Sequence, residues 1–148
     1  MYKHILVPTD GSKLSLAAAK TAAGLAKKVG ARITSVYVMA PYMPPIESDV
    51  AAFYPTYSAK GYEREVRKSA DKALARVKAV ADASRVKCEG VAVTGPSPWS
   101  DIIHTAKNKK CDLIVMASHG RRGLEALLLG SETQKVLTHS KVPVLVCR

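Results

Sequence analysis

Short apolar runs alternate with helical patterns along the whole chain, and this alternation restricts the possible folds more than any other feature. Runs typical of buried strands fall at 4–7, 33–39, 86–94, 113–117 and 142–146. Between them, apolar residues recur at helical spacing at 14–29, 62–81, 98–107 and 131–139. A helix between two strands favours a parallel pair, since parallel neighbours need a long crossover connection. The sequence therefore predicts an α/β fold: an open five-stranded parallel sheet with helices on both faces, which is Rossmann-like.

Residues that begin and end helices support two of these assignments. Gly30 stands directly after the first helical pattern, where a glycine commonly ends a helix. Ser97 is followed by Pro98, and a serine N-cap with proline at the first helical position is a strong start signal. The predicted first and third helices are thus bounded by local chemistry as well as by periodicity.

The size and composition of the chain are those of a soluble globular protein. At 148 residues, one domain spanning 1–148 is expected, and 47% hydrophobic residues with 24% charged residues are ordinary values. No run approaches the roughly 18 apolar residues of a membrane span, and the start has no long apolar segment of a signal peptide. The three cysteines show no CxxC spacing, which indicates reduced thiols. We predict a cytoplasmic protein that does not associate with membranes.

The charge balance is unusual. Lysine and arginine number 23 against 12 acidic residues, which gives a net charge of +11. Such a surplus favours anionic partners, whether nucleotides, nucleic acids or lipid headgroups. The basic residues are nevertheless spread over the predicted helices, with no run of five and no basic strand carrying aromatic residues that could stack on bases. This pattern argues against nucleic acid as the partner and favours solvated helix faces.

A glycine turn and a helix start follow the fourth predicted strand. Gly120 and Gly130 would each let main chain approach a bulky ligand, and Arg121 adds positive charge. Ser131 and Gln134 have the spacing of a capping box, so we expect Ser131 to be the N-cap of the last helix. The first N–H groups of such a helix attract anions, which predicts a phosphate-bearing ligand. The alternative is a glycine that only makes a turn and a box that only caps a helix.

Polar residues also follow the first predicted strand, where Pro8, Thr9 and Asp10 end it. Ligands of open parallel sheets bind beyond the carboxyl ends of the strands, where the strand order reverses. If the first and fourth strands are neighbours, Asp10 meets the glycine turn and becomes an acceptor for a base or sugar. Alternatively, Asp10 with Gly11 and Ser12 makes only a turn and a helix cap.

Other catalytic and cofactor motifs do not fit. The chain has no GxGxxG motif, and the P-loop spacing of Gly90 and Gly95 places Pro96 where the lysine belongs. The histidines show no metal-ligand spacing, and no nucleophile elbow or carboxylate pair is present. His119 is the one histidine that we keep as a site candidate, with turn stabilisation as its alternative role.

These features together resemble the universal stress protein family over the whole chain. The matching features are the segment 8–10, the turn at 117–120, nine intervening residues, Gly130 with Ser131, and the ending 142–146. The ATP-binding branch of that family has a motif of glycine, two residues, glycine, nine residues, glycine, then serine or threonine. Gly120, Gly130 and Ser131 fit this motif. Ala117 replaces its first glycine, which is tolerable where the backbone φ is negative.

The resemblance implies a strand order of 3-2-1-4-5 and an adenine-nucleotide site. Val38 and Met116 would pack against the adenine, and the segment 8–10 would lie beside base and ribose. Phosphate contacts would come from the start of the last helix. The implied site consists of Pro8, Thr9, Asp10, Val38, Met116, Ala117, His119, Gly120, Arg121, Gly130, Ser131, Glu132 and Thr133.

The implied ligand is ATP, with AMP or ADP as alternatives, and any Mg²⁺ or Mn²⁺ would be carried by the nucleotide. The implied role is a stress-response regulatory protein with little or no turnover, for which the residues identify no downstream protein partner. A slow ATPase, or an adenylating enzyme of a related α/β group, is one alternative. The latter would need a glycine-rich turn, whereas the loop reads Thr9, Asp10, Gly11, Ser12. A basic nucleic-acid-binding module is the other.

The last apolar segment, Val142 to Cys147, predicts an interface. A strand at the end of the sheet leaves one edge unpaired, and an apolar edge must be covered or paired. Pro143 shortens the exposed hydrogen-bonding ladder but does not hide the apolar side chains. The resemblance likewise implies a homodimer through this strand, which we expect to meet its twofold partner antiparallel. A helix that covers the same edge is the alternative.

Overall fold

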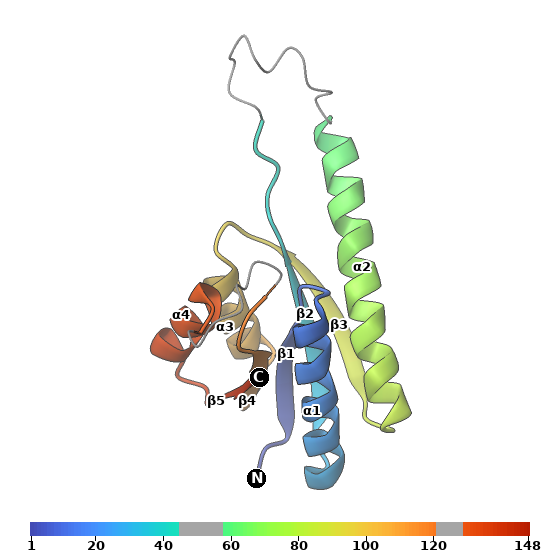
Figure 1. Ribbon diagram of the computed structural model, residues 1–148, viewed down its shortest axis with the longest axis vertical. Helices are drawn as coiled ribbons and strands as arrows, with labels where there is room; N and C mark the ends of the chain where they lie inside the picture. Colours follow the sequence, from blue (N-terminus) through green and yellow to red (C-terminus); the bar gives the residue numbers. More distant parts are fainter. Residues whose placement is uncertain (45–57, 121–128) are drawn as a thin grey trace.

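The computed structural model describes residues 1–44, 58–120 and 129–148 (Figure 1). Arg121, one of the predicted site residues, lies outside the described residues. In chain order the elements are β1 (His4–Pro8), α1 (Lys13–Val29), β2 (Arg32–Met39), α2 (Ala59–Ala83), β3 (Cys88–Thr94), α3 (Pro98–Asn108), β4 (Leu113–Ala117), α4 (Ser131–His139) and β5 (Val144–Cys147). Strands and helices alternate as the sequence predicts.

The strands form a sheet of order β3-β2-β1-β4-β5, and every neighbouring pair is parallel. The predicted α/β class and strand order are thus confirmed. β1 is the central strand and is buried along its whole length. A strand covered on both faces has no need to alternate apolar with polar residues, which explains its continuous apolar run.

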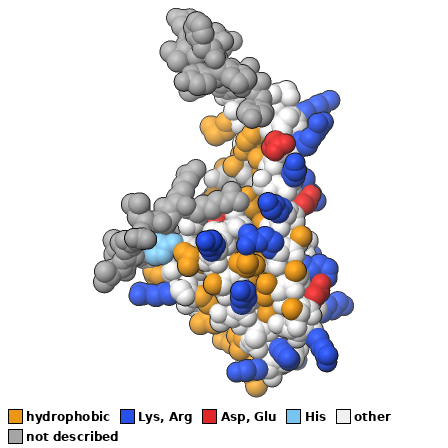
Figure 2. All heavy atoms as spheres, turned by 45° about the vertical axis from the view of Figure 1, so that its right-hand side comes forward, with side chains coloured by type: hydrophobic (Ala, Val, Ile, Leu, Met, Phe, Trp, Pro, Cys, Tyr) orange, Lys and Arg blue, Asp and Glu red, His pale blue; other side chains and the backbone are white. Residues whose placement is uncertain are grey.

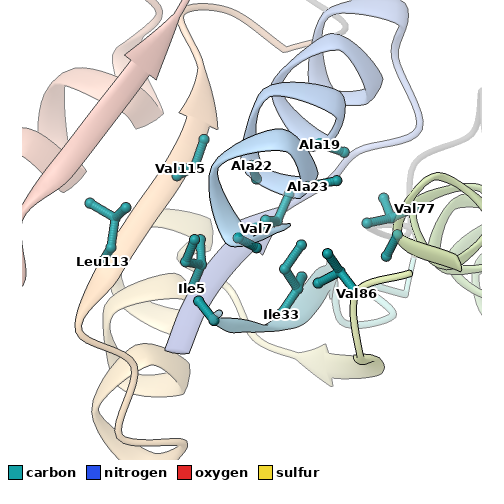
Figure 3. Close-up of a cluster of buried hydrophobic side chains, with 13 residues drawn as sticks. Ile5, Val7, Ala19, Ala22, Ala23, Ile33, Val77, Val86, Leu113 and Val115 are labelled. Atoms are coloured by element: carbon teal, nitrogen blue, oxygen red, sulfur yellow. The ribbon is translucent and has the colours of Figure 1, made fainter. Parts of the chain in front are cut away.

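The helices cover both faces of the sheet. Ile5 and Val7 of β1 pack with alanines of α1 and with Val77 of α2 in one buried cluster (Figure 3). Leu6, which points to the opposite face, packs with Ile102 of α3 and Val136 of α4 in another. Residues alternate between these clusters along β1 because successive side chains of a strand point to opposite faces. The sheet is therefore the middle layer between two layers of helices.

Two strands begin later than the sequence predicts, each because a turn occupies the preceding residues. Before β3, Arg85 has a left-handed φ of 58° and the N–H of Val86 still bonds the carbonyl oxygen of Ala81 at the end of α2. Before β5, the hydroxyl oxygen of Ser140 accepts a hydrogen bond from the N–H of Val142 at 3.0 Å. The end of α1 agrees with the prediction, since Gly30 caps this helix with a φ of 71°.

The basic residues of α1 and α2 are spread over exposed helix surface. Lys13, Lys20 and Lys27 of α1 are all exposed. On α2, Arg67 pairs with Asp71 and Lys78 with Asp82, each at 3.0 Å and on the same helix. Figure 2 shows Lys and Arg side chains scattered over the face that includes α2, with apolar and neutral surface between them. The predicted solvated helix faces fit this distribution.

A buried histidine joins the amino ends of three strands. His4 is 4% exposed, and its Nε2 lies 2.7 Å from the hydroxyl of Thr34. That hydroxyl donates its proton to Glu89 at 3.0 Å, so it must accept from His4. Nη2 of Arg32 lies 3.2 Å from His4 Nδ1, and arginine can only donate. The network therefore holds His4 neutral, with its proton on Nε2.

This histidine should make the fold sensitive to mild acid. Burial, and secondly the charge of Arg32, lower the pKa of His4 below its ordinary value of 6.5. The unfolded chain therefore binds a proton before the folded chain does, so stability is complete above pH 6.5 and falls as the pH decreases below it. We expect the free energy of unfolding in urea to decrease from about pH 7 to about pH 5.5, by at most about 1.4 kcal/mol per pH unit.

His4→Gln should flatten this dependence whatever its effect on stability at neutral pH. An unchanged pH dependence in His4→Gln would show that other groups cause it. The comparison is made above about pH 5, where carboxylates of ordinary pKa remain ionised in both states.

Candidate functional site

The loops after β1 and β4 meet at the carboxyl edge of the sheet. The two strands are paired, with Leu6 opposite Ile114, so the adjacency that the predicted site requires is confirmed. Beyond the strands, a Cβ placed on Gly120 would lie 2.6 Å from Oδ2 of Asp10. The carboxylate of Asp10 thus lies against the main chain of the glycine turn. A side chain at position 120 would therefore displace the carboxylate of Asp10.

The loop after β1 is held by its own hydrogen bonds. Oδ1 of Asp10 accepts from the N–H of Ser12 at 2.9 Å, and Ser12 in turn caps α1 by accepting from the N–H of Ser15 at 3.1 Å. Gly11 between them has a φ of 79°, a conformation that favours glycine. Asp10, Gly11 and Ser12 therefore do form a turn and a helix cap, with Ser12 as the cap. Asp10 takes part through one oxygen while its other oxygen faces Gly120.

One contact to this loop comes from a residue that the sequence reasoning missed. Nη1 of Arg76, on α2, donates a hydrogen bond to the carbonyl oxygen of Gly11 at 2.9 Å. The two residues are 65 positions apart, and Arg76 lies on the exposed side of an amphipathic helix. No local spacing signals such a contact. Arg76 brings a positive charge next to the Asp10 loop.

Three contacts made by Ser118 hold the turn after β4 in place. The N–H of Ser118 bonds the carbonyl oxygen of Cys147 at 2.7 Å, and the carbonyl oxygen of Ser118 accepts from the N–H of Gly130 at 2.8 Å. The hydroxyl of Ser118 lies 3.1 Å from Nδ1 of His119, so His119 does contribute to the turn. Ala117 is not among the described residues with positive φ, which are Arg85 and Lys110 apart from glycines. Alanine is therefore accommodated in place of the first motif glycine.

Gly130 packs tightly on this turn. A Cβ on Gly130 would lie 3.1 Å from the carbonyl oxygen of Ser118 and 3.3 Å from Cα of His119. Both are main-chain atoms, which cannot rotate out of the way as a side chain can. A Cβ at this position would therefore make the turn or the helix start give by a few tenths of an ångström, whether or not a ligand is bound.

The N-cap of α4 is Gly130, and the prediction that Ser131 caps this helix is wrong. Gly130 has φ −60° and ψ 147°, Ser131 is the first helical residue, and no side chain caps the helix. The carbonyl oxygen of Gly130 accepts from the N–H of Gln134 at 2.9 Å. The cap lies one residue earlier than predicted because Gly130 is already fixed against Ser118. The first N–H groups of α4, which have no acceptor within a helix, still lie directly beside the glycine turn.

The side chains of the first turn of α4 divide into inward and outward ones. Thr133 is buried, and its hydroxyl donates to the carbonyl oxygen of Ala117 at 2.9 Å. The carboxylate of Glu132 accepts a hydrogen bond from the N–H of Trp99 at 2.8 Å. Ser131 is exposed. Glu132 and Thr133 could therefore contribute main-chain N–H groups to an anion, and Ser131 could add its hydroxyl.

The apolar residues predicted for the adenine end share one environment. Met116 belongs to the buried cluster between the sheet and α3 with α4, and Val38 packs against the same cluster. Pro8 ends β1 opposite Val36 of β2, and Thr9 is 7% exposed. The described predicted residues thus come from the neighbouring strands β2, β1 and β4, the loops that follow β1 and β4, and the start of α4.

Three further findings concern the described residues. No group of three or more His, Cys, Asp and Glu within 1–44, 58–120 and 129–148 is arranged to hold a metal ion. In the same ranges, no helix has the length and apolar character that crossing a membrane requires. All three cysteines are free thiols, and burial raises the pKa of Cys111 to about 11.

The chain is similar over its whole length to proteins of one family. The family model described as the universal stress protein family matches residues 1–148. The universal stress protein MJ0531 of Methanocaldococcus jannaschii is 36% identical over 151 residues, which cover 100% of this chain and 83% of that protein. The chain therefore belongs to the universal stress protein family.

Solved structures agree in fold. The hypothetical protein MJ0577 is 26% identical with a TM-score of 0.79, over 99% of this chain and 95% of that one. A universal stress protein solved in complex with cAMP is 25% identical with a TM-score of 0.73, over 99% and 97% of the two chains. The five-stranded parallel sheet described above is thus shared with these proteins.

Proposed function

We propose that this protein binds ATP and acts as a nucleotide-loaded regulatory protein in the stress response, with little or no hydrolysis. Adenine packs near Val38 and Met116, Asp10 accepts from the nucleoside, and the phosphates lie at Gly130 and the first turn of α4. AMP and ADP bind to the same place with fewer phosphate contacts, and any Mg²⁺ or Mn²⁺ arrives with the nucleotide. The sequence supplies no clear base for attack on the terminal phosphate, which is why turnover is expected to be low.

One observation carries the proposal: the carboxylate of Asp10 lies against Gly120, and Gly130 at the start of α4 packs against His119, the residue before Gly120. This arrangement supports a ligand with two chemically different ends. A hydrogen-bonding sugar suits the Asp10 carboxylate, which repels phosphates, and anionic groups suit the helix start, which attracts them. Nucleotides have a sugar at one end and phosphates at the other. The solved universal stress protein in complex with cAMP, a relative of similar fold, supports an adenine nucleotide as the ligand class.

Asp10→Ala tests the nucleoside end. We expect calorimetric titration to show that adenosine and ATP both lose at least about tenfold in affinity and by similar factors, since a lost charged hydrogen bond costs about 1.5–3 kcal/mol. Asp71→Ala, at an exposed carboxylate of α2 paired with Arg67, is the matched control and should leave both affinities unchanged. A loss confined to ATP would move Asp10 to the phosphate or metal side, and unchanged affinities would remove it from the site.

We also propose a homodimer through β5. β5 is an edge strand, and Leu145 on it is 40% exposed. Pairing with a second copy would cover the open edge and its exposed leucine.

A further inference from the structure

The amino-terminal ends of α3 and α4 are joined by a side chain whose role the proposed nucleotide site does not explain. Oε2 of Glu132 accepts a hydrogen bond from the N–H of Trp99 at 2.8 Å. Ser97, the N-cap of α3, makes no side-chain capping bond, so Glu132 supplies an acceptor that the helix does not supply itself. A carboxylate at this position also interacts favourably with the positive end of the α3 dipole.

A second contact joins the same two helices. The ring of Trp99 lies against the ring of His139, with centroids 4.7 Å apart. Glu132 is in the first turn of α4 and His139 is its last residue, so Trp99 contacts both ends of the short helix. On the side of the sheet, the hydroxyl of Thr133 bonds the carbonyl oxygen of Ala117. Figure 1 shows α3 and α4 side by side on one face of the sheet.

The direction of the Glu132 side chain has an electrostatic consequence. An acidic residue in the first turn of α4 would repel phosphates at that helix start if its carboxylate faced them. Here the carboxylate is turned toward α3, with Nζ of Lys135 3.6 Å away on its own helix. Its charge is thus used to dock one helix on another, while its main-chain N–H remains in the first turn of α4.

We propose that Glu132 is a positioning residue, which fixes the first turn of α4 against α3 so that its N–H groups face the phosphates of a bound nucleotide. This inference rests on the proposed ATP binding. It assigns the Glu132 side chain to α3 and leaves phosphate contact to the main chain. The carboxylate therefore strengthens ATP binding although it has the same sign of charge as the ligand.

The direction in which ATP affinity changes when the Glu132 carboxylate is removed distinguishes the positioning role from simple repulsion between the carboxylate and the phosphates. We expect Glu132→Ala to weaken ATP binding about fivefold to tenfold in calorimetric titration, because a lost charged hydrogen bond loosens the helix start. Glu132→Gln, which keeps an acceptor oxygen at the same reach, should recover part of the loss. Adenosine, which has no phosphate, should bind all variants equally. Glu63→Ala removes the same charge from an exposed position on α2 and should change neither affinity.

Amide hydrogen exchange at Trp99 gives a readout that does not depend on nucleotide. Exchange there should be faster in Glu132→Ala than in the wild type, with Glu132→Gln between them. If both Glu132 variants bind ATP more tightly than the wild type, or as tightly, or if Trp99 exchanges at an unchanged rate, the positioning role is wrong. A wild type that binds no ATP would instead overturn the proposed function, and this inference with it.

Discussion

Gly130→Val is expected to lower the affinity for ATP by well over tenfold. The first side-chain carbon would lie 3.1 Å from the carbonyl oxygen of Ser118 and 3.3 Å from Cα of His119, and both atoms belong to a turn fixed by main-chain hydrogen bonds. The turn or the start of α4 must therefore shift, which changes the position of the first N–H groups of α4 relative to the turn. A displacement of this kind at an anion site removes several hydrogen bonds at once, each worth about 1.5–3 kcal/mol to a charged acceptor.

Gly24→Val is the matched control, because a Cβ at Gly24 on α1 would meet nothing within 4 Å. This variant has the same glycine-to-valine change at a position with no close neighbour, and it should leave ATP affinity unaltered. Far-ultraviolet circular dichroism and urea unfolding of both variants verify that the titrated protein is folded. Unchanged ATP affinity in a folded Gly130→Val protein would remove the nucleotide from this loop.

Leu145→Lys is expected to convert a dimer into a monomer. Leu145 is 40% exposed on the edge strand β5, and a lysine there would place two like charges near each other across a twofold antiparallel pair. Lysines at Val144 and Val146 would test the same strand, but Val144 packs against the cluster between the sheet and α3 with α4. A lysine at Val144 would thus also disturb the fold, which makes Leu145 the better probe.

Sedimentation velocity of the wild type and of two variants checks this expectation. Leu14→Lys is the matched control for the added charge, since Leu14 is exposed to the same 40% but belongs to α1 and not to the edge strand. The wild type and Leu14→Lys should sediment as dimers and Leu145→Lys as a monomer. The β5 interface is excluded if the wild type is monomeric, or if Leu145→Lys dissociates no more readily than the control.

The fold could be predicted because its signals are local. The buried run of β1, the alanines of α1 and the glycine at position 30 each specify a short segment, and alternating strands and helices leave few topologies. The sequence reasoning also placed Asp10 and Gly120 at one edge, since paired parallel strands end together. What required the structure are contacts between residues far apart in sequence.

The N-cap of α4 illustrates the limit. The spacing of Ser131 and Gln134 satisfies the local rule for a capping box, yet the helix starts at Ser131 after a Gly130 cap because Gly130 is held by Ser118. Tertiary packing outweighs a capping preference of about 1 kcal/mol. Similarly, Arg76 reaches Gly11 and Glu132 reaches Trp99 over 65 and 33 positions, distances at which no periodic pattern carries information.

Mass spectrometry of the small molecules released when the purified protein is gently denatured tests the central claim most directly. We predict an adenine nucleotide, which is ATP or alternatively AMP or ADP, in an amount comparable with that of the chain. A protein purified without nucleotide should then take up ATP in calorimetric titration, without measurable release of phosphate. A protein that releases no adenine nucleotide and binds none on titration would contradict the proposal that the Asp10 loop and the start of α4 form a nucleotide site.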